Sequence, residues 1–137
     1  MTEKEREFTN TVREHRSTIY SVCFMFAKSS DEADDLFQEV LIKLWHGFDG
    51  FEHRSNIATW IWRISLNTCI SMERTKRRSS SLKLDMSRNL YTDEDSDSRQ
   101  SQMLHKRIHR LRPFGRAIVL LWLENMSYEE IAAIVGI

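Results

Sequence analysis

The chain has 137 residues and a formal net charge of zero, with 41% hydrophobic and 29% charged residues, a balance typical of a folded globular protein and not of a disordered one. Four glycines and one proline are too few for the many turns of a sandwich or barrel, so the composition predicts an all-α fold. There is no apolar run of about 18 residues and no signal-peptide pattern at the N-terminus, which predicts a cytoplasmic protein without membrane insertion.

The neutral total hides a strong segregation of charge along the chain. Residues 31–52 hold seven acids and one base, whereas residues 54–78 hold six bases and one acid. Four acids then fall within residues 93–97, and five bases with no acid fall within residues 106–116. Because phosphate responds to local patches, this chain is compatible with nucleic-acid binding, although such blocks also solvate ordinary helix faces.

The first half of the chain predicts two helices with apolar residues at helical spacing. The first is expected over residues 5–28. After a break, Ser29 and Glu32 have the spacing of a capping box, and they open a second helix that Gly47 is expected to end. This second helix has the clearest pattern, one continuous apolar stripe. The stripe consists of Ala33, Leu36, Phe37, Val40, Leu41, Leu44 and Trp45.

A third helix is predicted over residues 57–74, with Asn56 as its N-cap. It has two apolar stripes, so we expect it either to be sandwiched between other elements or to offer an aromatic face to a ligand. Core packing is the favoured interpretation for Trp60, which lies on the first stripe. Trp62 lies on the second stripe, and for it both interpretations stay open. The helix ends in a basic cluster: Arg74, Lys76, Arg77 and Arg78.

Between residues 79 and 100 the helical pattern gives way to serine-rich and acidic sequence. This composition predicts a flexible acidic linker. A fourth helix is expected over residues 101–111. A fifth begins at Pro113, a residue that suits the first turn of a helix, and continues to about Leu123.

The last segment reads like the first half of a helix-turn-helix unit. Ser127 and Glu130 have capping-box spacing after a turn, and Gly136 suits the turn before a recognition helix. That recognition helix is expected after Ile137, so the unit is predicted to be truncated. A helical hairpin without a DNA role is the alternative for this segment.

Two stretches carry a resemblance to a known family. Residues 34–45 read Asp-Asp-Leu-Phe-Gln-Glu-Val-Leu-Ile-Lys-Leu-Trp, and residues 59–70 read Thr-Trp-Ile-Trp-Arg-Ile-Ser-Leu-Asn-Thr-Cys-Ile. With the C-terminal unit, they resemble the bacterial RNA polymerase sigma factors of the extracytoplasmic-function (ECF) group over nearly the whole chain. The resemblance implies a sigma region 2-like domain at residues 1–78, a linker at residues 79–100 and a truncated region 4-like domain at residues 101–137.

The resemblance assigns a polymerase-binding role to the second helix. In that family the pattern Asp-Leu-x-Gln-Glu-Val binds the clamp helices of the largest polymerase subunit. This implies core-polymerase binding by Asp35, Gln38 and Glu39. A solvated helix face is the alternative that periodicity alone would favour, but the match of the whole stretch reverses that preference. Acids there also suit a basic protein partner.

The third helix and the loop before it are implied to read DNA. The family's Thr-Trp-Leu-x-Arg-Ile-Ala-x-Asn helix matches residues 59–67, with Ile in place of Leu and Ser in place of Ala as departures. Its loop and helix read the −10 promoter element as melted non-template DNA. This implies contacts from the loop at residues 53–56 and from Arg63 and Asn67.

The chemistry of the third helix is consistent with that role. Holding one strand of an opened duplex needs cations beside phosphates, flat side chains for stacking, and amide or hydroxyl groups for the edge of a flipped base. The predicted DNA-binding residues are Arg54, Ser55, Asn56, Trp62, Arg63, Asn67, Arg74, Lys76, Arg77 and Arg78.

Catalytic and metal-binding patterns are missing from the sequence. It has no Gly-rich phosphate loop, no Gly-x-Ser-x-Gly and no Cys-x-x-Cys. His105 and His109 stand four residues apart, but the bases beside them repel a cation, so no metal site is expected. Cys23 and Cys69 are expected to be reduced core residues. No catalytic residue and no cofactor are predicted.

The combined prediction is a non-enzymatic transcription initiation factor that binds core RNA polymerase and directs promoter recognition and −10 melting. The resemblance also implies an anti-sigma partner. Two alternatives stay open, a helical protein-interaction module that never touches DNA and a one-component helix-turn-helix repressor. The repressor leaves the pattern from Asp35 to Trp45 unexplained.

Overall fold

The computed structural model describes residues 1–51, 56–79 and 96–136, with the side chains of residues 76–79 and 96–98 outside that description. Within these residues the chain is helical and has no strand, which confirms the predicted all-α fold. The helices are α1 (Glu3–Glu14), α2 (Arg16–Phe26), α3 (Ser30–Phe48), α4 (Ile57–Ser79), α5 (Ser96–His109), α6 (Pro113–Leu123) and α7 (Tyr128–Val135).

The predicted N-caps of α3, α4 and α7 are confirmed. Ser29 Oγ accepts a hydrogen bond from the backbone N–H of Glu32 at 3.1 Å, and Asn56 Oδ1 accepts one from that of Thr59 at 2.7 Å. At α7, Ser127 and the glutamate three residues later form both hydrogen bonds of a capping box. Local sequence therefore fixes where these three helices begin.

The segment predicted as one helix over residues 5–28 is two helices that meet at His15, where φ is −110° and ψ is 15°. α1 has no buried residue, whereas α2 contributes to the core. The ring of Phe8 in α1 lies 5.1 Å from the ring of Trp45 and 5.5 Å from that of Phe48. The break at His15 thus separates α1, which packs against the end of α3, from α2, which lies in the core.

Two helices extend into regions predicted to lack them. α4 continues past residue 74 to Ser79, and residues 96–100, predicted as linker, are the first turns of α5. Serine and acidic residues are common in linkers, but they also favour the first turn of a helix. Composition alone therefore did not distinguish a linker from a helix start at residues 96–100. The remaining linker residues, 80–95, lie outside the described residues. The division into two domains stays a prediction.

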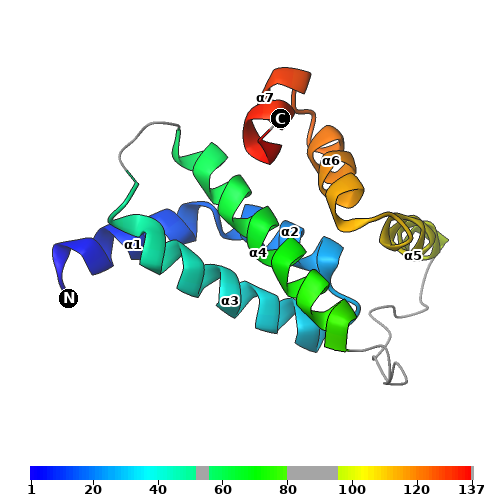
Figure 1. Ribbon diagram of the computed structural model, residues 1–137, viewed down its shortest axis with the longest axis horizontal. Helices are drawn as coiled ribbons and strands as arrows, with labels where there is room; N and C mark the ends of the chain where they lie inside the picture. The colour runs from blue at the N-terminus through cyan, green and yellow to red at the C-terminus, as the bar shows by residue number, and fades with distance from the viewer. Residues whose placement is uncertain (52–55, 80–95, 137) are drawn as a thin grey trace.

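One hydrophobic core runs through α2, α3, α4, α6 and α7. α2, α3 and α4 pack on one another, α5 and α6 contact α2, and α6 and α7 contact α4. Figure 1 shows α3 and α4 crossing the face of the bundle, with α6 and α7 stacked beside α4. The core cluster includes Ile19 and Leu44 from the bundle and Leu121 and Ile134 from the C-terminal helices. The two α4 stripes are explained by this arrangement, because α4 is sandwiched.

Candidate functional site

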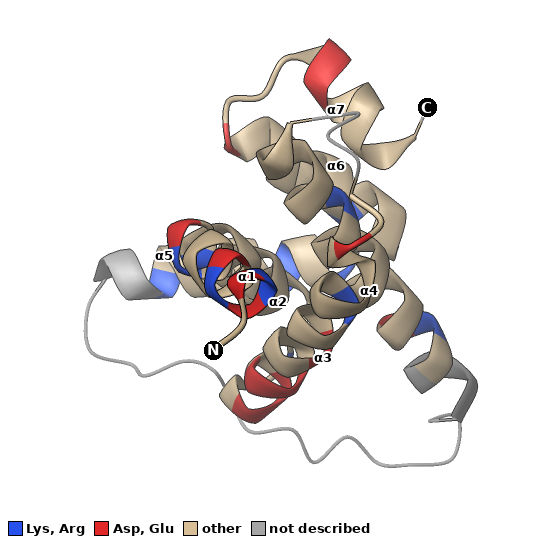
Figure 2. Ribbon diagram, turned by 90° about the vertical axis from the view of Figure 1, so that its left-hand side faces the viewer, with Lys and Arg blue, Asp and Glu red and all other residues tan. Residues whose placement is uncertain are grey.

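The predicted polymerase-binding residues lie together on the outer side of α3. Asp35 and Gln38 are exposed and Glu39 is half-buried, whereas Leu36 and Val40 of the same helix are buried in the core. Side chains three and four residues apart lie on one side of a helix, so the three polar residues form a single patch. Figure 2 shows further acids on the N-terminal part of α3. The result is an acidic surface on a helix whose opposite side is buried in the core.

Ile42 extends this patch and was missed by the sequence reasoning. Its side chain is 48% exposed, one turn beyond Gln38 on the same helix. The available signal was its position off the apolar stripe, where a merely solvated face would carry a polar residue. A single exposed apolar residue is common on protein surfaces, so Ile42 adds apolar area to the patch without identifying it as a binding face.

Three predicted DNA-binding residues share one face of α4. Arg63, Asn67 and Arg74 follow one another at spacings of four and seven, which are whole turns of a helix. Asn67 and Arg74 are exposed, and Arg63 is half-buried. This spacing gives α4 a polar and cationic line that could follow a phosphate backbone.

The other predicted DNA contacts are described less fully or not at all. Lys76, Arg77 and Arg78 belong to the last turn of α4, but their side chains are outside the description. Arg54 and Ser55 lie outside the described residues. Asn56 is exposed and its side chain caps α4, so it stands at the N-terminal end of the cationic line.

Trp62 does not fit the stacking role predicted for it. Its side chain is only 6% exposed and belongs to the core cluster, on the α4 stripe that also buries Leu66 and Cys69. A base cannot stack on an indole that is already covered. Trp60 is half-buried, with its ring 4.9 Å from the ring of Phe51, in line with the packing role that was favoured for it.

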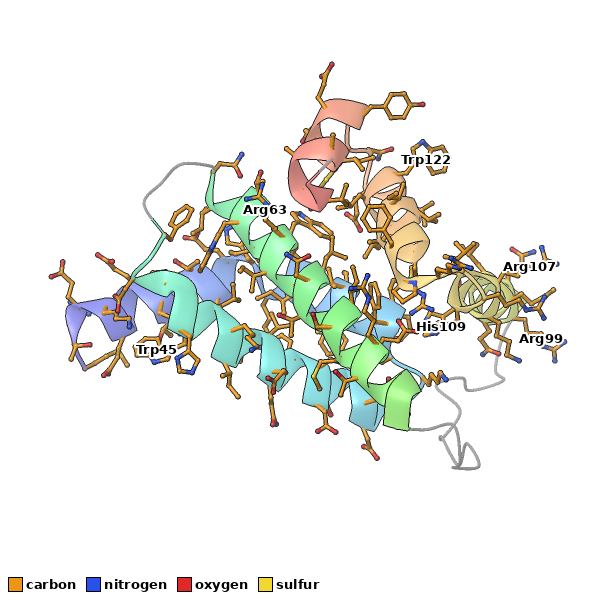
Figure 3. The ribbon with its side chains drawn as sticks, viewed as in Figure 1. Trp45, Arg63, Arg99, Arg107, His109 and Trp122 are labelled. Atoms are coloured by element: carbon orange, nitrogen blue, oxygen red, sulfur yellow. The ribbon has the colours of Figure 1, made fainter. Side chains whose placement is uncertain are left out.

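The C-terminal unit reaches the predicted DNA face at Arg63. A guanidinium nitrogen of Arg63 donates to the backbone oxygen of Ala133 in α7 at 2.6 Å. Figure 3 shows Arg63 on the side of α4 that faces α7. Gly136 ends α7 with a φ of 82°, a left-handed conformation that glycine adopts without strain, as expected for the turn after this helix.

A cleft of about 940 Å³ lies where α1, the end of α3 and the start of α4 meet. Amide, hydroxyl and ring groups line part of it, including Asn10, Thr11, Phe51 and Asn56. Acids also line it, and one of them, Asp49, is paired with Lys4 at 2.9 Å. The cleft therefore offers hydrogen bonds and a flat apolar surface to a neutral group, but it does not suit a phosphate.

Arg116 is a buried charge that sequence reasoning did not single out. It is 0% exposed, and it binds both carboxylate oxygens of Glu73 on α4, at 2.8 and 3.2 Å. It also donates to the backbone oxygens of Ile108, His109 and Leu111. The available signal was a single base in an otherwise apolar helix. Arg116 ties α6 and the end of α5 to α4.

The rings of His105 and His109 meet edge-on, with centroids 4.4 Å apart, and Arg116 donates to the backbone oxygen of His109. Their Nε2 atoms lie 3.2 Å apart, and His105 Nε2 lies 3.0 Å from the backbone oxygen of Phe24. Burial lowers the pKa of His105, and burial with the nearby Arg116 charge lowers the pKa of His109 to about 4. Among the described residues, no three metal-ligating side chains are grouped together.

The two cysteines are buried, unpaired thiols. The pKa of the Cys69 thiol is raised, chiefly by its hydrogen bond with Cys23 and also by burial. The Cys69 thiol therefore stays protonated, and both cysteines pack as small core residues. Of the helices in the described ranges, none combines the length and apolar character that crossing a membrane requires.

Comparison with known proteins gives a consistent picture. The chain is 32% identical over 76 residues to the ECF RNA polymerase sigma factor SigG of Mycobacterium tuberculosis, covering 56% of this chain and 20% of SigG. It is 28% identical over 134 residues to the ECF sigma factor SigE of Mycolicibacterium smegmatis, covering 92% of this chain and 52% of SigE. The chain thus spans between about a fifth and about half of the length of these relatives.

A solved structure shows the same likeness in three dimensions. The sigma factor RpoE of Bartonella quintana, crystallised in complex with the anti-sigma factor NepR, matches 96% of this chain and 84% of its own with a TM-score of 0.76 and 25% identity. Residues 11–79 match the Sigma-70 region 2 family, and this range holds α2, α3, α4 and the acidic patch. The chain belongs to the Sigma-70 region 2 family and is related to the ECF sigma factors.

Proposed function

We propose that this chain is an ECF-type sigma factor that binds core RNA polymerase and directs promoter recognition and −10 melting. The observation that carries the proposal is the polar patch of Asp35, Gln38 and Glu39 on the outer side of α3 in a Sigma-70 region 2 bundle. The chain supplies binding surfaces, and catalysis belongs to the polymerase. It acts in the cytoplasm, where polymerase and promoter DNA meet.

The DNA strand lies along the cationic line of α4 in this proposal. Arg63 and Arg74 supply charge for phosphates, Asn67 supplies an amide, and the basic residues at the end of α4 extend the line. The cleft beside Asn56 supports the capture of an unpaired base, because it offers amides, a hydroxyl and an aromatic ring while the acids in it repel phosphate.

The C-terminal unit acts in the same proposal as a region 4-like, DNA-reading domain. Its capped α7 and the glycine turn after it suit the first half of a helix-turn-helix. The related RpoE was crystallised with an anti-sigma factor, and we propose a partner of that class for this chain.

The polymerase assignment is tested by co-elution with purified bacterial core RNA polymerase. The wild-type chain should co-elute, and the double variant Asp35→Arg, Glu39→Arg should not, because two repulsive charges replace the acids at the centre of the patch. The matched control, Glu14→Arg with Glu124→Arg, makes the same charge change at exposed sites elsewhere and should co-elute. A folded wild-type chain that does not co-elute would overturn the proposed function.

The DNA assignment is tested separately, with a labelled single-stranded −10 oligonucleotide and the chain bound to core polymerase. Arg74→Gln should weaken binding and make it less dependent on salt, because one phosphate contact is lost. Arg13→Gln removes an exposed base from α1 and should leave binding unchanged. Equal binding by wild type and Arg74→Gln at every salt concentration would remove Arg74 from the interface.

A further inference from the structure

A groove runs along the seam between α3 and α4. Two cavities of about 310 and 360 Å³ lie in it, and Met72 and Thr75 line both of them. Met72 is 40% exposed, and it is not among the residues assigned above to DNA or polymerase binding. The groove therefore has an apolar side chain at its middle and open space on either side.

The first cavity combines an apolar floor with an acidic rim. Its lining includes Leu36 and Cys69, which are buried core residues of the two helices. Glu32, Asp35 and Glu73 also line it, and Arg116 holds the Glu73 carboxylate in place. An aliphatic side chain that enters this cavity would replace water on apolar surface, while a cation beside it would meet carboxylates.

The second cavity differs in charge from the first, so the two ends of the groove are not equivalent. It is lined from α3 by Glu39 and Lys43, and from α4 by residues such as Ser71. Asn67 also lines it, at the border between the groove and the cationic line of α4. Because Arg116 balances the charge of Glu73, the acids Glu32 and Asp35 give the first cavity its negative charge, whereas an acid and a base face the second. A partner that fits both cavities must be more basic at the end that lies over the first.

The length of the groove matches a helix. From Glu32 to Lys43 is eleven residues along α3, or about 16 Å at 1.5 Å per residue. This corresponds to roughly three turns of a partner helix, enough for an aliphatic residue at each cavity. Because Asp35 and Glu39 line the groove as well as the outer patch of α3, the groove is continuous with the proposed polymerase-binding patch.

We propose that the polymerase-binding site is this two-helix groove and not α3 alone. Its occupant is an amphipathic helix of the polymerase, with an aliphatic side chain in the first cavity and basic residues beside Glu32 and Asp35. Met72 packs against that helix between the two cavities. The inference rests on the proposed function and adds residues of α4 that the family resemblance did not assign.

The experiment measures the affinity of full-length variants for purified bacterial core RNA polymerase. Met72→Glu places a charge in the middle of the groove and should weaken binding by at least about tenfold, as expected for a central apolar contact. Met72→Leu keeps an apolar side chain and should bind like wild type. The matched control is Met103→Glu, the same change at a methionine of α5 that is 54% exposed, and it should bind like wild type.

The outcomes separate this inference from the proposed function. If Asp35→Arg, Glu39→Arg loses binding while Met72→Glu binds like Met103→Glu, the polymerase contacts α3 alone and the groove proposal is overturned. If the folded wild-type chain does not bind, the proposed function fails first. Circular dichroism of Met72→Glu shows whether it is folded. Should it unfold, Met72→Ala is measured instead, and wild-type affinity in that folded variant would equally overturn the proposal.

Discussion

At the scale of single residues, the buried hydroxyl of Ser65 lowers the stability of the fold, and a substitution would remove this effect. Its Oγ is buried in α4 with no hydrogen-bond partner among the described residues. An unpaired buried hydroxyl costs about 1–3 kcal/mol, so Ser65→Ala should raise the free energy of unfolding by about 1 kcal/mol. Urea unfolding measures this free energy. The control is Ser71→Ala at an exposed position, which should change the free energy of unfolding by less than about 0.5 kcal/mol. A destabilised Ser65→Ala would show that the hydroxyl has a partner.

The buried pair of His105 and His109 predicts that the protein loses stability in acid. The pKa of His109 is lowered from 6.5 to about 4, mainly by burial, then by Arg116, His105 and Lys28, against an opposing hydrogen bond to the Ala27 backbone. A histidine with a lower pKa in the folded state binds protons more tightly when the chain is unfolded. Its stabilising effect is therefore complete above pH 6.5 and is lost as the pH falls towards 4.

Urea midpoints measured across that pH range check this prediction. The wild-type midpoint should fall with pH, and His109→Gln, which has no titrating group at this position, should show a flatter dependence. Exposed His46→Gln is the control and should follow the wild type. Parallel curves for wild type and His109→Gln would contradict the prediction.

At the scale of elements, two substitutions at Asn56 distinguish its role in capping α4 from its proposed role in binding DNA. Its side chain caps α4, so Asn56→Ala should lower the free energy of unfolding by about 1 kcal/mol. Asn56→Asp caps a helix equally well but adds a negative charge at the end of the cationic line. It should keep the stability measured in urea while weakening binding of the −10 oligonucleotide. Unchanged oligonucleotide binding in Asn56→Asp would place the DNA strand elsewhere.

At the scale of the whole molecule, Arg116 holds the C-terminal helices to the bundle. Its side chain is 1% exposed and that of Glu73 is 15% exposed, so removing Arg116 takes a bidentate cationic partner away from a largely buried carboxylate. Arg116→Met should therefore lower the free energy of unfolding by about 3 kcal/mol in urea. The exposed pair of Lys4 and Asp49 is the control, and Lys4→Met should cost less than about 1 kcal/mol. Equal effects of the two variants would contradict the role given to Arg116.

Much of this protein follows from local sequence. The apolar stripe of α3 put Asp35, Gln38 and Glu39 on its outer side, and caps such as Ser29 and Ser127 placed helix starts, because periodicity and capping act within a few residues. Shared spacing likewise put Arg63, Asn67 and Arg74 on one face. The family motifs could also be recognised in the sequence, because each of them lies within a single helix.

The tertiary structure decided what each face meets. Trp62 and Arg116 show this best: an indole that could have met a base is covered in the core, and a base that looked like part of a positive patch is a buried partner of Glu73. The ion pair joins α6 to α4, two segments far apart in the chain. Periodicity gives the direction of a side chain around its own helix, but only packing determines whether solvent, nucleic acid or another helix lies there.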